Sequence, residues 1–434
     1  MGQPNIVYLH SHDTGRYLQP YGQQIPTPNI QRLADQGLLF RQAFCAAPSC
    51  SGSRACLLTG QWAHVNGMMG LAHRGWKLHD YGRHIVHPLR EAGYWSGLVG
   101  EQHLSIDPGV LGYDHVTDLG STKVSAIAPA AMQLIESRPP QPFFLSVGFF
   151  ETHREFFAPA SVRDALYGAP PSNLADTPET RTDMAGFKAS ARSLDQGVGA
   201  VLQALDEYGF ADDTVVVLTT DHGLAFPGAK GTTTDAGLGV TLIIRGPRGF
   251  HGGHVFDSLV SQVDLYPTLL ELAGATPPDG IHGYSLLPLV RKQQTEIRDE
   301  LFAELTYHAA YDPQRAIRTH RHKLIRLYGD RLEPVLPNID DSPSKDLLVR
   351  AGWGEQPRPR VALYDLVLDP GEMRNLVDDA FHADVLSDLD DRLHQWMVET
   401  GDPLLDGPVP PASGVHVNDP AGISARDPLL SEID

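Results

Sequence analysis

The order of apolar runs along this chain predicts an α/β fold with three layers, in which helices cover both faces of a central sheet. Five short runs are rich in β-branched and aromatic residues and almost continuously apolar, as is typical of strands buried on both faces of a parallel sheet. They are Asn5–Leu9, Tyr94–Gly100, Pro142–Phe150, Thr214–Asp221 and Gly239–Gly246. Segments of helical character alternate with these runs, and that alternation is the second indication of an α/β sandwich.

The expected helices are recognised by their ends and their amphipathic pattern. Thr27 precedes Pro28 and Gly37 closes the same segment, which is the usual order of N-cap, first helical residue and C-cap. Further helices are expected at Ser190–Tyr208 and Val263–Ala273.

The pattern changes after about residue 314, so we expect an α/β domain over residues 1–314 and a smaller α+β domain over residues 315–434. The second domain should contain antiparallel strands within 316–329 and 361–369, followed by an amphipathic helix at Ala383–Glu399. The final segment is rich in Pro and Gly and is expected to wrap the surface or to contact a partner subunit in a homo-oligomer.

Composition excludes several classes of function. The chain has 34 basic and 53 acidic residues and a formal net charge of −19, without a block of Lys and Arg, so a nucleic-acid partner is not expected. No apolar run approaches the ~20 residues of a membrane span, and the first residues lack a secretory pattern. We therefore expect a soluble cytoplasmic protein whose substrate is small or short-chain.

Three cysteines, Cys45, Cys50 and Cys56, lie in one short segment. They are too few for a disulfide scaffold and are not accompanied by a zinc-binding pattern. Cys45 and Cys56 are interpreted as small buried hydrophobic residues.

Metal-ligand types follow two of the expected strands. The first strand runs into Asp13, and a much later strand runs into Asp221 and His222. Ligands collect at the carboxyl edge of open α/β sheets, and carboxylate and imidazole groups from two strand ends suit one divalent cation. The alternative for each pair alone is a loop cap or a turn.

The assignment of the first strand end depends on where the strand stops. Adjacent strand residues face opposite sides, so Asp13 is the expected ligand, whereas His12 either joins it or orients another ligand. His10 is interpreted as structural.

The segment Ser49–Gly60, "SCSGSRACLLTG", combines small residues with an apolar run that can form a helix closed by Gly60. Cys50 would then lie at the helix N-terminus, where the dipole favours anions and lowers the pKa of a thiol. Arg54, about one turn further, adds a positive charge. A tetrahedral anion would meet the cation, the helix end and Arg54 together; the alternative is a structural cysteine beside a surface arginine.

This segment resembles the signature of the sulfatase family, in which a cysteine is followed by Pro at +2, Arg at +4 and then Leu-Thr-Gly. The matching residues are Cys50, Arg54, Leu58, Thr59 and Gly60, whereas Gly52 stands in the proline position. The resemblance covers nearly the whole chain, through segments such as "TPNIQRLADQGLLFRQAF", "TTDHGLAFPGAKG" and "ALYDLVLDPGEMRNLVDD", and is strongest to the heparan N-sulfatase (sulfamidase) branch.

The resemblance implies an alkaline-phosphatase-like α/β domain with a smaller C-terminal domain that contains a four-stranded antiparallel sheet. It also implies that a formylglycine-generating enzyme oxidises Cys50 to formylglycine, whose hydrate is the nucleophile. By the same resemblance, one divalent cation, Ca²⁺ or alternatively Mn²⁺, is held by Asp13, Asp221, His222 and the residue at position 50. His12 stands where the family has a second aspartate.

The remaining site residues are also carried over from the family. Arg54 matches the residue that holds the nucleophile, and Lys230 matches the cation on the sulfate oxygens. His153 matches the histidine that contacts the sulfate and protonates the leaving group, and His103 matches a histidine beside the aldehyde hydrate. The alternative for each of these two histidines is a structural role, as a polar residue whose hydrogen bonds are made within the protein. Glu101 replaces a family lysine, so it either turns away or meets a positive or donor group of the substrate.

These observations predict a metal-dependent sulfatase that cleaves a sulfate ester or a sulfamate. A phosphonate monoester or phosphodiester hydrolase is the first alternative, because sulfate and phosphate esters share a tetrahedral geometry. A metal-binding pseudoenzyme with an unconverted Cys50 is the second, and Gly52 and Glu101 motivate it.

Overall fold

The structure is a computed structural model that describes residues 2–430. The strands are β1 (Asn5–Ser11), β2 (Leu38–Phe40), β3 (Ala43–Phe44), β4 (Trp95–Gly100), β5 (His115–Thr117), β6 (Phe143–Gly148), β7 (Thr214–Thr220), β8 (Leu242–Arg245), β9 (His254–Phe256), β10 (Val260–Ser261), β11 (Glu300–Tyr307), β12 (Tyr311–Thr319), β13 (His322–Leu327) and β14 (Val361–Asp365). The α-helices are α1 (Pro28–Gln36), α2 (Cys50–Thr59), α3 (Ala63–Asn66), α4 (Val86–Glu91), α5 (Val124–Glu136), α6 (Val162–Leu166), α7 (Pro178–Glu207), α8 (Asp235–Leu238), α9 (Leu265–Ala273), α10 (Leu287–Val290), α11 (Pro343–Arg350) and α12 (Ala383–Thr400).

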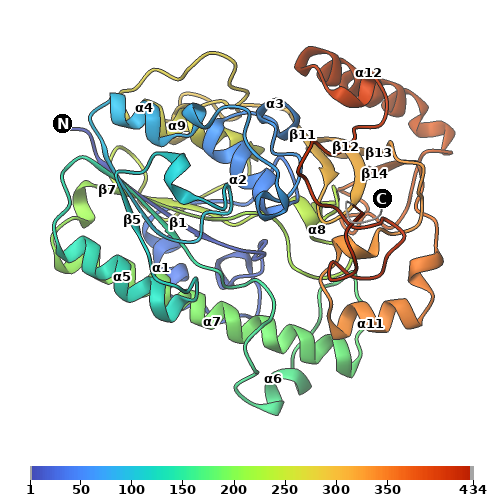
Figure 1. The fold of residues 1–434 in the computed structure, drawn as a ribbon, viewed down its shortest axis with the longest axis horizontal. Helices are drawn as coiled ribbons and strands as arrows, with labels where there is room; N and C mark the ends of the chain where they lie inside the picture. The colour runs from blue at the N-terminus through green and yellow to red at the C-terminus, as the bar shows by residue number, and fades with distance from the viewer. Residues whose placement is uncertain (1, 431–434) are drawn as a thin grey trace.

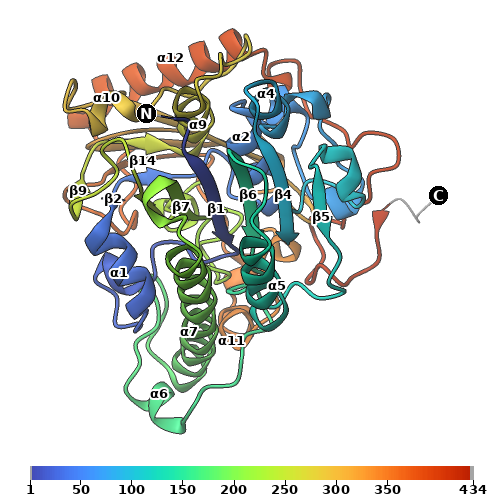
Figure 2. The ribbon, with the colours of Figure 1, turned by 90° about the vertical axis from the view of Figure 1, so that its left-hand side faces the viewer.

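An eight-stranded sheet with the order β5-β4-β6-β1-β7-β8-β2-β9 forms the centre of the larger part of the molecule. Helices α1, α5 and α7 cover one face, and α2, α4 and α9 cover the other (Figures 1 and 2). This arrangement confirms the predicted three-layer α/β sandwich. Strand β8, however, runs antiparallel to β7 and β2. The sequence does not predict this direction, because an apolar run that is buried on both faces carries no information about strand direction.

The central strands are apolar throughout because each of their faces packs against a different hydrophobic cluster. Tyr8 and Val217 contribute to the cluster under α2, α4 and α9, whereas Val7 and Val216 contribute to the cluster under α1, α5 and α7. The alternation follows the period-2 geometry of a strand. Full burial of each such side chain stabilises the fold by roughly 1.5–3 kcal/mol.

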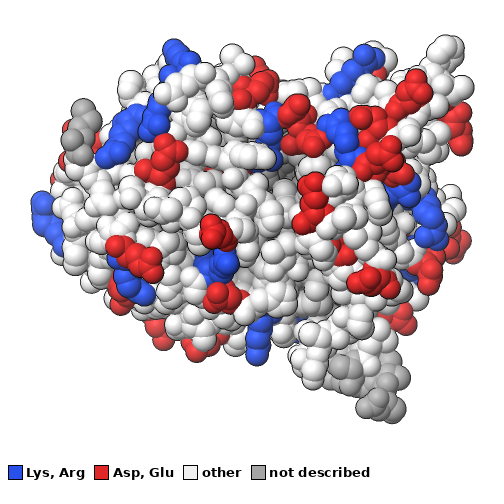
Figure 3. Space-filling model, turned by 90° about the horizontal axis from the view of Figure 1, so that it is seen from above, with Lys and Arg blue, Asp and Glu red and all other residues white. Residues whose placement is uncertain are grey.

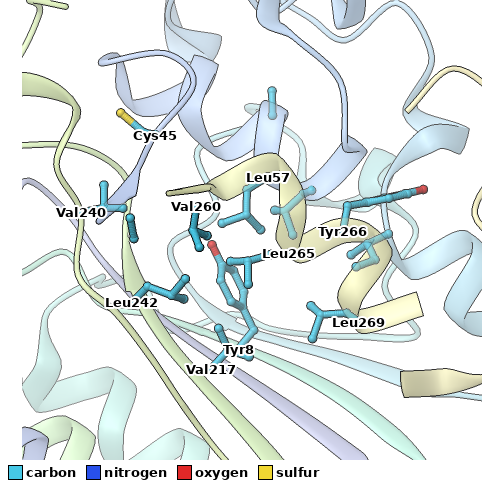
Figure 4. Packing of buried hydrophobic residues seen from close by; sticks show 14 of the residues in the cluster. Tyr8, Cys45, Leu57, Val217, Val240, Leu242, Val260, Leu265, Tyr266 and Leu269 are labelled. Carbon is cyan, nitrogen blue, oxygen red and sulfur yellow. The ribbon is translucent and has the colours of Figure 1, made fainter. Parts of the chain in front are cut away.

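The cysteines beside the expected nucleophile are structural. Cys45 and Cys56 are buried and free, and Cys45 packs among apolar residues such as Val240 and Leu242 (Figure 4). They therefore occupy the positions of small hydrophobic residues, as expected.

The helix expected at Ser190–Tyr208 is the C-terminal part of the much longer α7, which begins at Pro178 after the N-cap Thr177. The helix expected at Val263–Ala273 begins with a short 3₁₀ turn and continues as α9.

Strands β11–β14 form a separate four-stranded antiparallel sheet in sequential order, and α12 packs against it (Figure 1). The predicted antiparallel sheet is present, but it begins at Glu300. Residue 314 lies inside β12. The expected boundary between residues 314 and 315 therefore divides the sheet, and β11 lies within the range expected for the first domain.

A buried polar cluster joins the two sheets. Glu304 of β11 donates its backbone N–H to Ala46 O at 2.9 Å, and its carboxylate lies 2.9 Å from His64 Nδ1. Arg315 of β12 is 0% exposed and lies 3.0 Å from Asp402 Oδ1. The antiparallel sheet is therefore fixed to the segment that leads into α2 and Cys50.

The C-terminal segment lies against the surface within the described residues. Asn418 forms an isolated bridge with Ala310, and its Oδ1 accepts from Arg74 at 2.8 Å. On the face shown in Figure 3, basic side chains are interspersed with acidic ones. Within residues 2–430, no helix combines the length and apolar character that crossing a membrane requires.

Candidate active site

The candidate residues gather at the carboxyl edge of the central sheet. Strands β1 and β7 are parallel neighbours, and their register pairs Ser11 with Thr220. Asp13 and Asp221 therefore leave the sheet at the same edge, where the backbone N–H of Asp13 donates to Asp221 Oδ1 at 2.8 Å. The structure thus brings the two predicted strand ends together.

His12 joins this group because β1 has ended before it. The strand stops at Ser11, and Asp13 adopts the left-handed φ of 51°, so strand alternation no longer separates the two side chains. His12 Nδ1 lies 3.1 Å from Asp221 Oδ2. His10 remains inside the strand and is buried, in keeping with a structural role.

Cys50 and His222 complete a compact cluster with the two carboxylates. Cys50 Sγ lies 3.2 Å from His222 Nε2, which in turn lies 3.3 Å from Asp13 Oδ1. One ligand atom from each of His12, Asp13, Cys50 and Asp221 falls within 4.8 Å of the others. Asp13 Oδ1 and His12 Nε2 are buried without a hydrogen-bond partner among the described residues, an arrangement that suits a bound cation.

Arg54 makes its direct contacts with Asp221 rather than with Cys50. Its Nη2 lies 3.0 Å from Asp221 Oδ2 and donates to Ser11 O at 2.9 Å. Burial alone would raise the pKa of Asp221, but the charges of His222 and Arg54 outweigh burial and hold that pKa well below its ordinary value. Arg54 therefore keeps this carboxylate ionised and ties α2 to the end of β1.

The surroundings of Cys50 differ from those expected for an activated thiol. Cys50 is the first residue of α2 and is 2% exposed. Burial raises the pKa of its thiol well above the ordinary value; Lys230 opposes this shift, whereas Asp221 and Asp13 reinforce it. This direction is opposite to the one expected from the helix end, because desolvation of the thiol is the largest cause of the shift.

Lys230 lies between two carboxylates at the entrance of the cluster. Its Nζ is 3.1 Å from Asp13 Oδ2, 3.0 Å from Asp340 Oδ2 and 3.4 Å from His153 Nε2. Burial would lower the pKa of Lys230, but Asp13 and Asp340 raise it well above its ordinary value. The side chains of His153 and Asp340 are 23% and 22% exposed, so solvent reaches the cluster from this side.

His103 also borders the cluster, with its ring centroid 5.7 Å from that of His12. It adopts a φ of 56°, and its Nε2 lies 2.8 Å from Nδ1 of the exposed His73. Ligand atoms of His103, His12 and Cys50 fall within 4.8 Å of one another. Burial lowers the pKa of His103 well below its ordinary value, and His73 lowers it further, so the ring is neutral and can accept a proton.

Glu101 follows β4 and is half-buried. Its Oε1 accepts from the backbone N–H of Gln102 at 3.1 Å. No contact of this carboxylate with Lys230 or Cys50 is recorded in residues 2–430, although its charge raises the pKa of Arg54. Glu101 therefore caps its own loop at the edge of the site.

Three neighbours of the site were not identified from the sequence. They are Asp340, His73 and His308, the last of which places Nδ1 3.0 Å from Ser49 Oγ. Asp340 and His308 lie in connections between strands of the antiparallel sheet, far along the chain from Cys50. His73 lies only a short distance beyond Cys50, in a single 3₁₀ turn, Ala72–Arg74, that is too short to show a periodic pattern.

Two family models match this chain. The family model described as "Sulfatase" matches residues 4–275, and the model described as "N-sulphoglucosamine sulphohydrolase, C-terminal" matches residues 230–345. The chain is similar to human N-sulphoglucosamine sulphohydrolase, with 30% identity over 93% of this chain and 92% of the relative. It is also similar to an ulvan-active sulfatase of Formosa agariphila, with 26% identity over 97% and 84% of the two chains.

Solved structures share the fold. A protein crystallised with D-glucosamine-2-N,6-O-disulfate superimposes with a TM-score of 0.73 at 20% identity, over 94% of this chain and 99% of the other. A phosphonate monoester hydrolase from Silicibacter pomeroyi superimposes with a TM-score of 0.72 at 21% identity, over 92% and 96% of the chains. These similarities show the alkaline-phosphatase-like fold.

Proposed function

Because this chain belongs to the sulfatase family, we propose that it hydrolyses a sulfate ester or a sulfamate of a small or short-chain substrate. The observation that carries the proposal is the placement of Cys50, buried at the start of α2 in one cluster with Asp13 and Asp221. Formylglycine derived from Cys50 would supply two geminal hydroxyls, one as the nucleophile and one to release the product.

The cluster has the composition of a site for one divalent cation. Asp13, Asp221 and His222 would hold the ion together with the residue at position 50, and His12 supplies a further imidazole. Carboxylate oxygens suit Ca²⁺ and Mn²⁺, and the imidazole donors favour Mn²⁺ of the two. The ion would polarise sulfuryl oxygens and favour the ionised form of a hydroxyl bound to it.

Lys230 and His153 act on the substrate from the exposed side. Nζ of Lys230 is held by Asp13 and Asp340, so its charge is fixed where negative charge develops on the sulfuryl oxygens. One such preorganised group typically contributes about 10²–10³-fold in rate. His153 Nε2, 3.4 Å from Lys230 Nζ, faces the same position and donates a proton to the departing oxygen or nitrogen, a contribution of roughly 10²–10⁴-fold.

His103 is the second histidine that acts beside residue 50. Its ring is kept neutral by burial, and Nδ1 is buried without a hydrogen-bond partner in the described part of the chain. Nδ1 can therefore accept the proton of the second hydroxyl when sulfate leaves.

The first test is peptide mass analysis of the Cys50 peptide after coexpression with a formylglycine-generating enzyme. The thiol-to-aldehyde conversion is expected in the wild type, and Cys50→Ala should abolish activity. Cys56→Ala, in the same helix, is the matched control because Cys56 lies in the core away from the cluster. Unmodified thiol throughout would favour a metal-binding pseudoenzyme and contradict the proposal.

The second test compares hydrolysis rates for an aryl sulfate, a sulfamate and a phosphodiester. A phosphonate or phosphodiester hydrolase is the second candidate, because the likeness to the phosphonate monoester hydrolase covers nearly the whole fold. The proposed function predicts the larger kcat/KM on one of the two sulfur substrates. A larger kcat/KM on the phosphodiester would contradict the proposed function and favour the phosphonate or phosphodiester hydrolase.

A further inference from the structure

A second polar cavity lies next to the active site, at the same edge of the central sheet. It has a volume of about 560 Å³ and extends from the loop after β1 to the loop after β14. Its charged and aromatic walls include Arg16, Tyr17, Arg41, Asp235, Arg318 and Glu372. None of the residues assigned to the reaction lines it.

Two arginines of this cavity have no acidic partner. The half-buried Arg16 donates from Nη1 to the backbone O of Arg41 at 3.0 Å, and its guanidinium lies 4.5 Å from the ring centroid of Phe44. No carboxylate of residues 2–430 forms an ion pair with Arg16 or with the exposed Arg41. Burial lowers the pKa of Arg16, and the neighbouring Arg318 lowers it further, whereas Asp235 partly opposes them.

The two acidic residues of the cavity are already engaged. Asp235 lies 3.1 Å from Arg318 Nη2 and 2.9 Å from Lys323 Nζ. Glu372 lies 3.0 Å from the same lysine. Three arginines, Arg16, Arg41 and Arg318, therefore line the cavity with only two carboxylates, in a chain whose net charge is −19. Partly buried charge without compensation is costly. An anionic ligand would compensate this excess of positive charge.

We propose that this cavity binds an organic anion of the size of a monosaccharide, whose acidic group pairs with Arg16 and Arg41. Guanidinium forks match the paired oxygens of sulfate, phosphate and carboxylate groups. A cavity of about 560 Å³ lies within the range of small-molecule sites. The half-buried Tyr17 supplies an aromatic face with a polar tip, which suits a sugar ring.

The cavity and the active site share one loop but use different sides of it. Arg16 follows Asp13 by three residues, so their Cα atoms are at most about 11 Å apart. Between them, Gly15 donates to His222 O at 3.0 Å and accepts from Thr241 N at 2.8 Å. The site is independent of the conversion of Cys50, and the inference does not rest on the proposed function.

Calorimetric titration of the full chain carrying Cys50→Ala, which prevents turnover, tests the inference. The probes are glucose 6-sulfate, glucose 6-phosphate and glucuronate, with glucose as the uncharged control. We expect at least one acidic probe to bind and glucose not to bind. Arg41→Gln, at an exposed position, should weaken that binding by at least about tenfold. Arg32→Gln, which removes an exposed arginine on α1, should leave it unchanged.

Location is tested by soaking crystals of the same protein in sodium selenate and measuring anomalous scattering. A peak between Arg16 and Arg41 that disappears in Arg16→Gln supports the inference, whatever is found beside Lys230. A peak confined to the neighbourhood of Lys230 overturns it and leaves the proposed function intact. Equal affinity of the Arg41→Gln and Arg32→Gln variants for every acidic probe also overturns it.

Discussion

Replacing Arg315 by methionine should destabilise the protein more than any surface ion pair could. Arg315 is 0% exposed; it donates to Leu305 O at 2.9 Å and lies 3.0 Å from Asp402 Oδ1. Its loss leaves Asp402 and Glu304 as buried carboxylates short of their cation. Breaking a buried charge pair in this way costs about 3–5 kcal/mol.

The expected change in melting temperature follows from the size of the chain. At ~2.1 cal/mol/K per residue, the entropy of unfolding is about 0.9 kcal/mol/K, so the loss corresponds to a Tm lower by roughly 3–6 °C. Differential scanning calorimetry measures this shift. Arg392→Met is the matched control: Arg392 is 36% exposed and contacts Glu300 and Asp388, and it should change the stability by at most ~1 kcal/mol. Equal shifts for the two variants would refute the reasoning.

Three further outcomes are expected. Lys230→Ala, assayed well below its melting temperature, should lower kcat/KM by about 10²–10³-fold because it removes the cation beside Asp13, and it should also lower the Tm because it leaves that buried carboxylate without its ion pair; an unchanged kcat/KM in steady-state assays would contradict that role. Incubation with EDTA should abolish activity and lower the Tm, and Mn²⁺ should restore both more completely than Mg²⁺; full activity of metal-free protein, verified by elemental analysis, would exclude the proposed cation. Burial would raise the pKa of Glu304, but His64 and Arg315 lower it to about 2. The difference from the unfolded pKa corresponds to roughly 3 kcal/mol of folding free energy. This stability is present above the unfolded pKa of ~4.3 and is lost as the pH falls towards 2, so Glu304→Gln should flatten the decrease of Tm with falling pH; parallel curves for variant and wild type would be inconsistent with it.

The parts of the site that the sequence predicts are those that local rules can place. Asp13 and Asp221 follow strand-like runs, and parallel neighbours end at one edge, so their convergence follows from topology. The position of Cys50 at the start of a helix follows from the small residues before it and Gly60 after it. Each inference uses a pattern of only a few neighbouring residues.

The parts that the sequence does not predict depend on contacts between distant segments. Asp340 reaches Lys230 only because the antiparallel sheet docks beside α2, and no periodic pattern marks its loop. The direction of β8 was missed for a related reason, since burial on both faces looks the same in either orientation. The thiol of Cys50 is the third case: its neighbours along the chain suggest a low pKa, whereas burial by remote segments raises it.

The burial of Cys50 would set a time limit on the conversion to formylglycine that the proposed function requires. An enzyme that modifies Cys50 could not reach a side chain that is 2% exposed, so it would have to act before the chain around position 50 has closed. Asp340, which contacts Lys230 from the far end of the site, is made long after Cys50. At about 5–20 residues per second, the roughly 290 residues between them take on the order of 15–60 s to synthesise. The nascent chain thus provides an interval during translation in which the cysteine is still accessible.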